Sequence, residues 1–273
     1  MSTPPPRPAG AALLDLVARV GAWSIDNLRG LGHNAFFMVE LLRALPAAFG
    51  RFHLVVVQLY AIGVRSMVII AASGLTVGFV LGLQGYYTLS RFGAAESLGL
   101  LVALSLVREL GPVVTALLFA GRAGTSLTAE IGLMKAGEQL AAMELMAVDP
   151  RRRVLAPRFV AGIIAMPLLA AIFSAVGIFG GYVVGVLMLG IDVGQFWGQM
   201  QEGVDVWRDV GNGIVKSMVF GVACTFVALY QGYESQATPE GVARATTRTV
   251  VISSLAVLLL DFVLTAMMFS TPR

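Results

Sequence analysis

The chain has 273 residues, of which 57% are hydrophobic and only 13% are charged, about half of the ~25% found in ordinary soluble domains. Its formal net charge is +3, and the basic residues are spread along short loops, which argues against nucleic-acid binding. One cysteine excludes an internal disulfide, and no Cys/His cluster has metal-ligand spacing. We therefore predict an integral membrane protein without a metal or a cofactor.

Residues 1–45 form a region of their own. The start is rich in proline and lacks the apolar core and cleavage site of a signal peptide, so we expect the mature chain to begin here. From Ala11 to Leu45 apolar residues recur at helical spacing, interrupted by frequent charges. Such a helix cannot cross a bilayer and is too short to bury a core of its own. We predict a tail followed by an amphipathic helix in the cytoplasmic interface.

Residues 46–273 contain five runs that are long and apolar enough to cross a bilayer, which needs ~20 apolar residues. The predicted spans are Ser66–Ser90 with a start near Tyr60, Ser97–Gly121, Phe159–Ile191, Gly213–Gln231 and Thr249–Phe269. Small residues repeat every four positions in three spans, at Gly74, Gly78 and Gly82, at Gly177, Gly181 and Gly185, and at Gly213, Ser217 and Gly221. This pattern predicts an all-α bundle with close helix contacts, within one chain or between two.

The distribution of Lys and Arg predicts the orientation. With the N-terminus in the cytoplasm, fourteen of these residues fall on the cytoplasmic side and three on the opposite side. The positive-inside rule therefore predicts a multi-pass protein with a cytoplasmic N-terminus and an outer C-terminus. The acidic stretch 192–209, with Trp197 and Trp207, is predicted to form a helix on the outer surface.

Three charged residues inside predicted spans are candidate functional groups: Arg108 and Glu109 at the centre of the second span, and Lys216 near the start of the fourth. A charge at a helix centre costs ~2.5–3.5 kcal/mol on insertion scales, so these side chains should face the bundle or a wet cavity. Pro112 withholds the amide that the Arg108 carbonyl would accept, which predicts a kink. In one interpretation Glu109 neutralises Arg108 or Lys216. In the other, the net charge of +1 suits a single phosphodiester, which a guanidinium can grip.

The longest predicted cytoplasmic loop, Arg122–Arg158, contains strong helix formers over 137–147 and ends that helix at Asp149-Pro150. Its apolar stripe carries methionine, which suits a groove on another protein. The alternative is a helix lying on the bilayer surface, to which acidic residues are poorly suited. The predicted contact residues of this coupling helix are Glu138, Leu140, Met143 and Glu144.

The segment 107–150 resembles the signature of MlaE-type permeases, the lipid ABC transporter subunits of Gram-negative inner membranes. The resemblance rests on Val107-Arg-Glu-Leu-Gly-Pro, on Gly121-Arg-Ala-Gly-Thr-Ser and on the stretch up to Pro150, and it covers most of residues 50–270. It implies a homodimeric permease in the inner membrane, with two cytoplasmic ATPase subunits on its coupling helices. A STAS-domain regulator bound to the ATPase and a periplasmic hexamer of MCE-domain proteins are also implied.

The same resemblance implies the function. A permease of this family moves glycerophospholipids between the inner membrane and the periplasmic MCE partner, which maintains outer-membrane lipid asymmetry. The family's lipid-contacting polar positions correspond to Arg108, Glu109 and Lys216, and positions of its lipid pocket correspond to Leu81 and Phe92.

The chain is predicted to be a permease without catalytic residues. An ATP site needs a Gly-x-x-x-x-Gly-Lys-Ser/Thr loop, and neither Lys135 nor Lys216 follows a glycine, so ATP hydrolysis is expected in a partner. One alternative is an ion-coupled secondary transporter with Arg108, Glu109 and Asp261 as a proton relay. Five spans do not divide into two equal inverted halves, which opposes it. The other alternative, a membrane anchor that transports nothing, gives little reason to bury Arg108 and Glu109.

Overall fold

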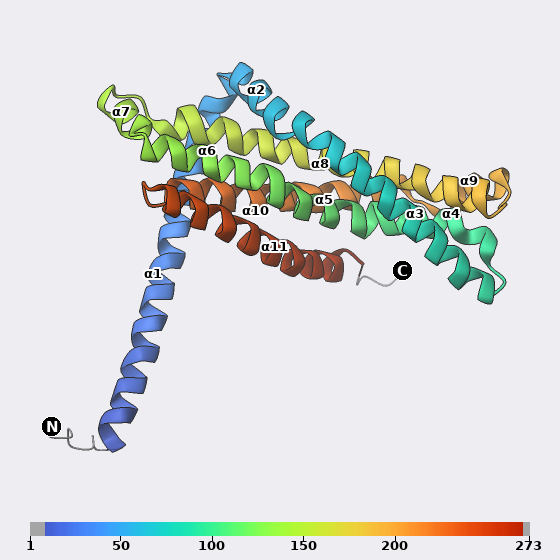
Figure 1. Ribbon diagram of the computed structural model, residues 1–273, viewed down its shortest axis with the longest axis horizontal. Coiled ribbons are helices and arrows are strands. Elements are labelled where there is room, and N and C mark those ends of the chain that lie inside the picture. The colour runs from blue at the N-terminus through green and yellow to red at the C-terminus, as the bar shows by residue number, and fades with distance from the viewer. Residues whose placement is uncertain (1–8, 270–273) are drawn as a thin grey trace. The chain divides into compact units, whose positions relative to one another are not determined.

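The computed structural model describes the backbone of residues 9–269 and most side chains from residue 29 onward (Figure 1). These residues form helices and no strand. Within them, five stretches are long and apolar enough to cross a membrane: Phe52–Arg91, Ala95–Ala136, Arg151–Met188, Val206–Tyr233 and Pro239–Met268, here spans 1 to 5. The prediction of an all-α membrane protein with five spans is confirmed.

The first four spans each join several helical segments. Span 1 contains α2 (Phe52–Ile62), η1 (Val64–Ser66) and α3 (Met67–Arg91), and span 2 contains η2 (Ala95–Ser97), α4 (Leu98–Ser105), η3 (Leu106–Leu110), α5 (Gly111–Phe119), η4 (Ala120–Gly124) and α6 (Thr125–Ala136). Span 3 contains η5 (Arg151–Leu155), α8 (Ala156–Tyr182) and η6 (Val183–Met188), span 4 contains η7 (Val206–Val210) and α10 (Gly211–Tyr233), and span 5 lies in α11 (Pro239–Phe269).

The chain divides into two compact units between Arg43 and Ala44. Helix α1 (Ala9–Phe49) supplies the described part of the first unit up to Arg43, its last residues belong to the second unit, and the predicted proline-rich tail lies outside the described residues. On α1, the apolar side chains of Phe36, Val39 and Leu42 are exposed at a spacing of three residues. This spacing puts them on one side of the helix, as an interfacial helix requires, and the interfacial position stays a prediction.

Helix α8 forms the centre of the five-span unit, where it packs against α3, α10, α2 and α5. Phe159 and Phe173 of α8 are fully buried. The glycine repeats explain the close contact with α3, because a Cβ atom on Gly78 would overlap the carbonyl oxygen of Gly177. Gly82 similarly lies against Gly181. The repeats of spans 1 and 3 therefore pack against each other within one chain.

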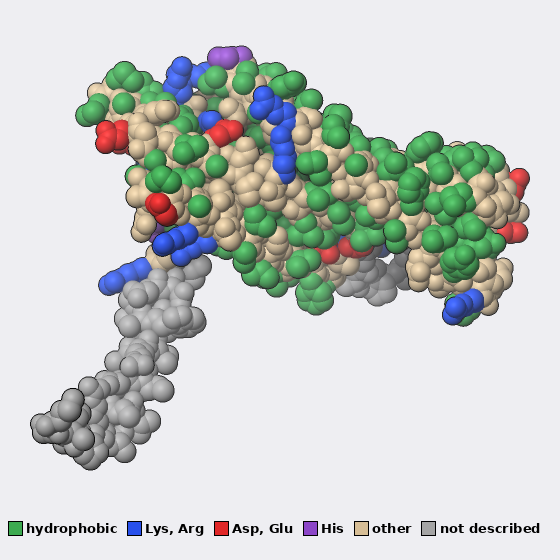
Figure 2. Space-filling model, in the orientation of Figure 1, with side chains coloured by type: hydrophobic (Ala, Val, Ile, Leu, Met, Phe, Trp, Pro, Cys, Tyr) green, Lys and Arg blue, Asp and Glu red, His purple; other side chains and the backbone are tan. Residues whose placement is uncertain are grey.

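The two short helices outside the spans lie at opposite ends of the bundle (Figure 1). Helix α7 (Gln139–Leu145) connects spans 2 and 3, and α9 (Val193–Gly203) connects spans 3 and 4. On the face of the bundle drawn in Figure 2, hydrophobic side chains cover the middle, and most Lys and Arg side chains lie toward the α7 end. This is the separation of charge from hydrocarbon that a membrane-spanning bundle requires.

The predicted loop Arg122–Arg158 is largely helical. Helix α6 continues to Ala136 and span 3 begins at Arg151, so α7 and short turns make up the connection. The coupling helix predicted over 137–147 is correspondingly shorter, at Gln139–Leu145. Charges mark where a helix leaves the hydrocarbon, but the backbone hydrogen bonds continue into the aqueous side. The charge pattern therefore ended the second span too early and began the third too late.

The prediction of one outer helix over 192–209 is wrong at its end. Helix α9 begins after Asp192, whose Oδ1 accepts from the Gln195 N–H at 3.0 Å, and it ends at Gly203. The chain is then extended at Val204 and Asp205. The Asp205 carboxylate accepts from the N–H groups of Trp207 and Arg208, which starts the new helical segment that leads into span 4.

We predict that Gly78→Ala destabilises the protein by about 1–3 kcal/mol, the usual effect of overpacking, because the new methyl group meets the Gly177 backbone. The measurement is thermal unfolding of the purified protein in detergent. Gly121→Ala is the matched control, since a Cβ there meets nothing within 4 Å, and its better helix propensity stabilises by up to ~1 kcal/mol. Equal unfolding temperatures for the two variants would contradict the packing model.

Candidate functional site

Span 2 departs from α-helical geometry just before Pro112. Over Leu106–Leu110 the helix widens to a π turn, in which the Gly111 N–H bonds the Leu106 carbonyl five residues earlier. Pro112 has no N–H for the Arg108 carbonyl, and the wider turn accommodates this gap. The irregularity predicted at Pro112 therefore takes the form of a π turn, a feature often found at functional sites. Arg108 and Glu109 both lie in it.

The Lys216 ammonium group, on α10, joins three spans. Its Nζ lies 2.6 Å from Glu109 Oε2 of span 2, and it donates to Asp261 Oδ1 at 3.2 Å and to Thr265 Oγ1 at 2.6 Å, both of span 5. Thr265 in turn donates to Glu109 Oε2 at 3.2 Å. The Lys216 side chain is 0% exposed. An ammonium has three N–H donors, and these three oxygens match them in number. The predicted ion pair between Glu109 and Lys216 is confirmed.

Arg108 pairs with a residue that the sequence reasoning placed elsewhere. Its Nη2 and Nε lie 2.6 and 2.8 Å from Asp209 Oδ1, while Asp209 Oδ2 accepts from the Asp205 N–H at 2.9 Å. Asp209 was expected on the outer-surface helix but is fully buried, whereas the Arg108 side chain is 33% exposed. The turn at Asp205 points the following segment back into the bundle, which brings Asp209 to Arg108.

The charge count of the site therefore differs from the prediction. The predicted net charge of +1 came from Arg108, Lys216 and Glu109 alone. The ion pairs add Asp209 and Asp261, so the five residues carry two formal positive and three formal negative charges. A net charge of +1 is thus no longer an argument for a phosphodiester. The partial exposure of Arg108, and of Glu109 at 37%, is what leaves the site open to a ligand.

Of the two positions expected in a lipid pocket, Leu81 lies on span 1 and Phe92 directly follows its end. Leu81 is half-buried against the core in α3, and Phe92 follows the end of α3 with its ring exposed. The charged residues lie on spans 2, 4 and 5. Lipid contact at Leu81 and Phe92 stays a prediction.

The predicted coupling residues divide into a buried and an exposed set. Leu140 is 6% exposed, so it anchors α7 to this chain and is not the free docking residue that we expected. Met143 is half-buried, and Glu138 and Glu144 are exposed. The large apolar side chains exposed at the end of α7 are Leu145, its last residue, at 89%, and Met146, directly after it, at 67%. Sequence periodicity identified an apolar stripe but could not tell which part of it faces this chain.

Tyr233, at the end of α10, holds both ends of the α7 connection. Lys135 of α6 donates to the Tyr233 carbonyl oxygen at 2.6 Å. The Lys135 Nζ and the Arg151 Cζ lie 5.8 and 5.7 Å from the centre of the Tyr233 ring, within the range of cation–π attraction. Tyr233 therefore links α7 to the helix that carries Lys216. The sequence reasoning missed this residue, because a tyrosine at a helix end is ordinarily an interfacial residue.

Among the described residues, no group of three or more His, Cys, Asp or Glu side chains could hold a metal ion. The arrangement is instead suited to binding a polar group through hydrogen bonds and charge, inside a bundle of apolar helices. Arg108 offers guanidinium donors and Glu109 offers acceptors at the partly exposed side of the network.

Comparisons with known proteins give a consistent result. Residues 55–267 match the family described as Permease MlaE. The intermembrane phospholipid transport system permease protein MlaE of Haemophilus influenzae is 55% identical over 94% of this chain and 98% of its own length. A probable ABC transporter permease protein of Rickettsia typhi is 36% identical over 94% of this chain. The chloroplastic protein TRIGALACTOSYLDIACYLGLYCEROL 1 of Arabidopsis thaliana is 29% identical over 78% of this chain and 60% of its own length.

We predict that Lys216→Met destabilises the protein by about 3–5 kcal/mol, because it leaves Glu109 and Asp261 facing each other without their shared cation. Unfolding by denaturant in detergent micelles measures the effect. Glu130→Gln is the control: it removes an exposed ion pair with Arg158, which should change stability by less than about 1 kcal/mol. A Lys216→Met protein as stable as the control would show that the network does not hold the three spans together.

Proposed function

This chain belongs to the MlaE permease family, and from that premise we propose how it acts as the membrane subunit of an ABC transport system for phospholipids. It is a permease and not an enzyme, as predicted. The observation that carries the mechanism is the network of charged side chains inside spans 2, 4 and 5. The relatives are named as permeases of ABC systems, which favours this function over an ion-coupled transporter or a membrane anchor.

Transport by an ABC system requires an ATPase partner, and we propose that it docks on α7. The support is the exposed pair Leu145 and Met146, which forms an apolar patch beside the acidic Glu138 and Glu144. Methionine adapts to irregular grooves, and acidic residues at a rim can meet basic residues of a partner. Leu140 then acts from inside, as the residue that fastens α7 to the permease.

Movement of α7 would reach the charged network through Tyr233. Lys135 and Arg151 flank the α7 connection on either side, and both lie against the ring of Tyr233. Tyr233 ends the same helix that carries Lys216. Because an α-helix is stiff along its axis, a displacement at one end of α10 is transmitted to the other. The proposed route thus runs from α7 to Tyr233 and along α10 to Lys216.

The proposed lipid contact is the partly exposed side of the network. Arg108 would bind the phosphate and Glu109 the polar groups beside it, while the fully buried Lys216 positions Glu109. A guanidinium binds phosphate oxygens strongly even when one edge pairs with a carboxylate. Leu81 of span 1 and Phe92, directly after its end, would contact the acyl chains.

The wider assembly follows the family. We propose that the protein lies in the bacterial inner membrane with its N-terminus in the cytoplasm and its C-terminus in the periplasm, supported by the basic residues near α7. A homodimer is supported by the exposed apolar face of α11, which includes Leu255, Leu259 and Phe262. A STAS-domain regulator on the ATPase and a periplasmic MCE hexamer near α9 would complete a transporter that maintains outer-membrane lipid asymmetry.

We predict that Met146→Glu weakens ATPase binding at least about tenfold while the permease still folds, because burial of such a side chain contributes ~1.5–3 kcal/mol. A pull-down of the ATPase from membranes measures the bound fraction. Val193→Glu is the matched control: it also puts a carboxylate at an exposed apolar position, but on α9 at the opposite end of the bundle. Normal ATPase binding by Met146→Glu would rule out this docking surface.

We predict that the double variant Arg108→Gln/Asp209→Asn assembles but moves phospholipid at least about tenfold more slowly, since a charge-assisted hydrogen bond contributes ~1.5–3 kcal/mol. Neutralising both partners avoids leaving Asp209 as a buried unpaired carboxylate. Transfer of a fluorescent phospholipid from proteoliposomes measures the rate. Arg91→Gln, at the exposed end of α3, is the control. A double variant with the wild-type rate would contradict the assignment of Arg108.

A further inference from the structure

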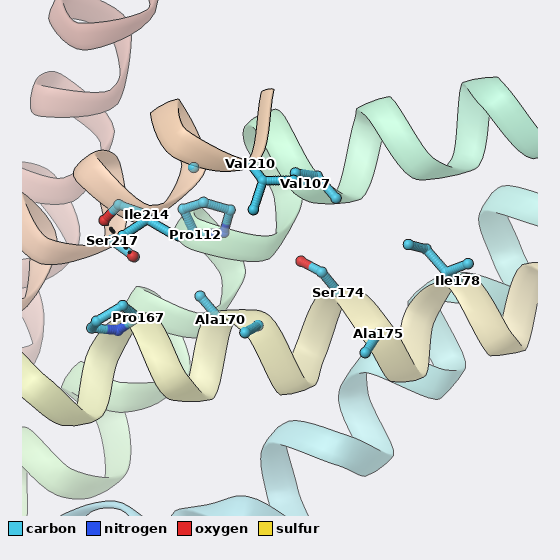
Figure 3. Close-up of a pocket in the computed structure, with 12 residues that line it drawn as sticks. Val107, Pro112, Pro167, Ala170, Ser174, Ala175, Ile178, Val210, Ile214 and Ser217 are labelled. Carbon is cyan, nitrogen blue, oxygen red and sulfur yellow. Dashed lines mark hydrogen bonds between the residues drawn. The ribbon is translucent and has the colours of Figure 1, made fainter. Parts of the chain in front are cut away.

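A cavity of about 260 Å³ lies between α8 and the facing parts of spans 2 and 4, away from the side chains of the charged network. Figure 3 shows it as a slot along α8, from Pro167 to Ile178, with Pro112 and Val107 on one opposing helix and Val210 and Ile214 on the other. At 1.5 Å per residue, this stretch of α8 is about 16 Å long. The cavity is therefore elongated in the direction of the spans.

The lining of the cavity is hydrocarbon in character. Its two hydroxyl groups are already hydrogen-bonded to backbone carbonyls: Ser174 donates to Leu106 at 3.3 Å, and Ser217 donates to Ile214 at 2.8 Å. The other lining residues are alanine, valine, isoleucine, proline and glycine. An apolar cavity of roughly 150 Å³ already stays dry and binds benzene. The larger cavity in this protein is suited to an apolar ligand, and it offers a water molecule few hydrogen-bond partners.

The cavity opens on the outer surface of the bundle. Ala171 and Ala175 on α8 and Ile214 on α10 line it and are exposed, and Leu168 beside them is also exposed. Because these spans cross a bilayer, the opening faces hydrocarbon. The slot's length of about 16 Å is close to half of the ~30 Å hydrocarbon thickness, which is the depth of one leaflet.

We propose that this cavity is a lateral site for one acyl chain of a membrane phospholipid. An acyl chain lies along the bilayer normal, as the slot does, and it restores the dispersion contacts that an empty cavity lacks. The site is separate from the proposed headgroup contact at Arg108, and it requires only that the spans cross a bilayer. Val107 and Val210 line it, each next in sequence to a member of the Arg108–Asp209 ion pair, so a bound chain packs against the segments that this pair joins.

The test uses proteoliposomes of the full-length protein that contain a phosphatidylcholine with a diazirine on one acyl chain. After photolysis, mass spectrometry maps the labelled residues. We expect denser labelling of Ile178 and Ile214, which line the cavity, than of Val57 and Val68, which are exposed on span 1 and lie outside both the cavity and the proposed dimer face of α11. Equal labelling of the two pairs would show that lipid contacts the cavity no more than other exposed apolar surface, and it would overturn the proposal.

A cavity-filling variant makes the test specific. In Ala175→Phe the ring occupies the slot, and labelling of Ile214 should fall about tenfold, since displacing two buried methylenes costs about that factor in affinity. Labelling of Val57 should not change. Ala72→Phe, at an exposed alanine on α3, is the control and should change neither. If Ala175→Phe does not fold, Ala171→Leu fills the same slot with less bulk. Undiminished labelling of Ile214 in a folded filling variant, or crosslinking of the cavity to another protein chain in place of lipid, would overturn the proposal.

Discussion

The structure depends on one electrostatic constraint: an ammonium group buried among membrane-spanning helices has to be surrounded by acceptors. Lys216 meets this requirement with oxygens from two other spans, Glu109 on span 2 and Asp261 and Thr265 on span 5. Span 5 is the least buried of the five, with 11% of its most apolar window buried. One face of span 5, with Thr249, Ser253 and Val257, is buried against the bundle. The contacts with Lys216 add an electrostatic attachment to this packing, and losing the cation would leave two carboxylates without compensation.

The same three spans are joined a second time nearer the α7 end. Thr128 of α6 shares hydrogen bonds with the Ala228 carbonyl of α10 and with Thr249 of α11, at 3.0 and 2.8 Å. Hydroxyl contacts of this kind let helices approach closely in the absence of a hydrophobic driving force. Spans 2, 4 and 5 are thus held at two levels by hydrogen bonds, one level neutral and one charged. Tyr233 joins these helices to the α7 connection at the end of α10.

The sequence predicted what depends on local composition and could not predict what depends on tertiary turns. Charge-free runs located all five spans, and the cost of burying charge in a bilayer singled out Arg108, Glu109 and Lys216. Asp209 was misplaced because the extended residues at Asp205, which turn it inward, have no strong signal in a stretch that reads as polar surface. Leu140 was misassigned for a similar reason: helical periodicity gives the apolar face of α7 but not the side of it that this chain covers.

The contact between α3 and α8 and the contacts among spans 2, 4 and 5 differ in how easily they can rearrange. At Gly78 and Gly177 the contact between α3 and α8 is backbone against backbone, which leaves little room for a second arrangement at that point. The contacts among spans 2, 4 and 5 are ion pairs and hydroxyl bonds, in which one oxygen can replace another at similar distance. Lys216 pairs with both Glu109 and Asp261, so a small shift of its ammonium group can strengthen one pair and weaken the other. In the proposed mechanism, a phosphate at Arg108 competes with Asp209. Because a ligand shifts a conformational equilibrium only through contacts that differ between its states, the polar side of the bundle is where we propose that lipid and ATPase act on the same equilibrium.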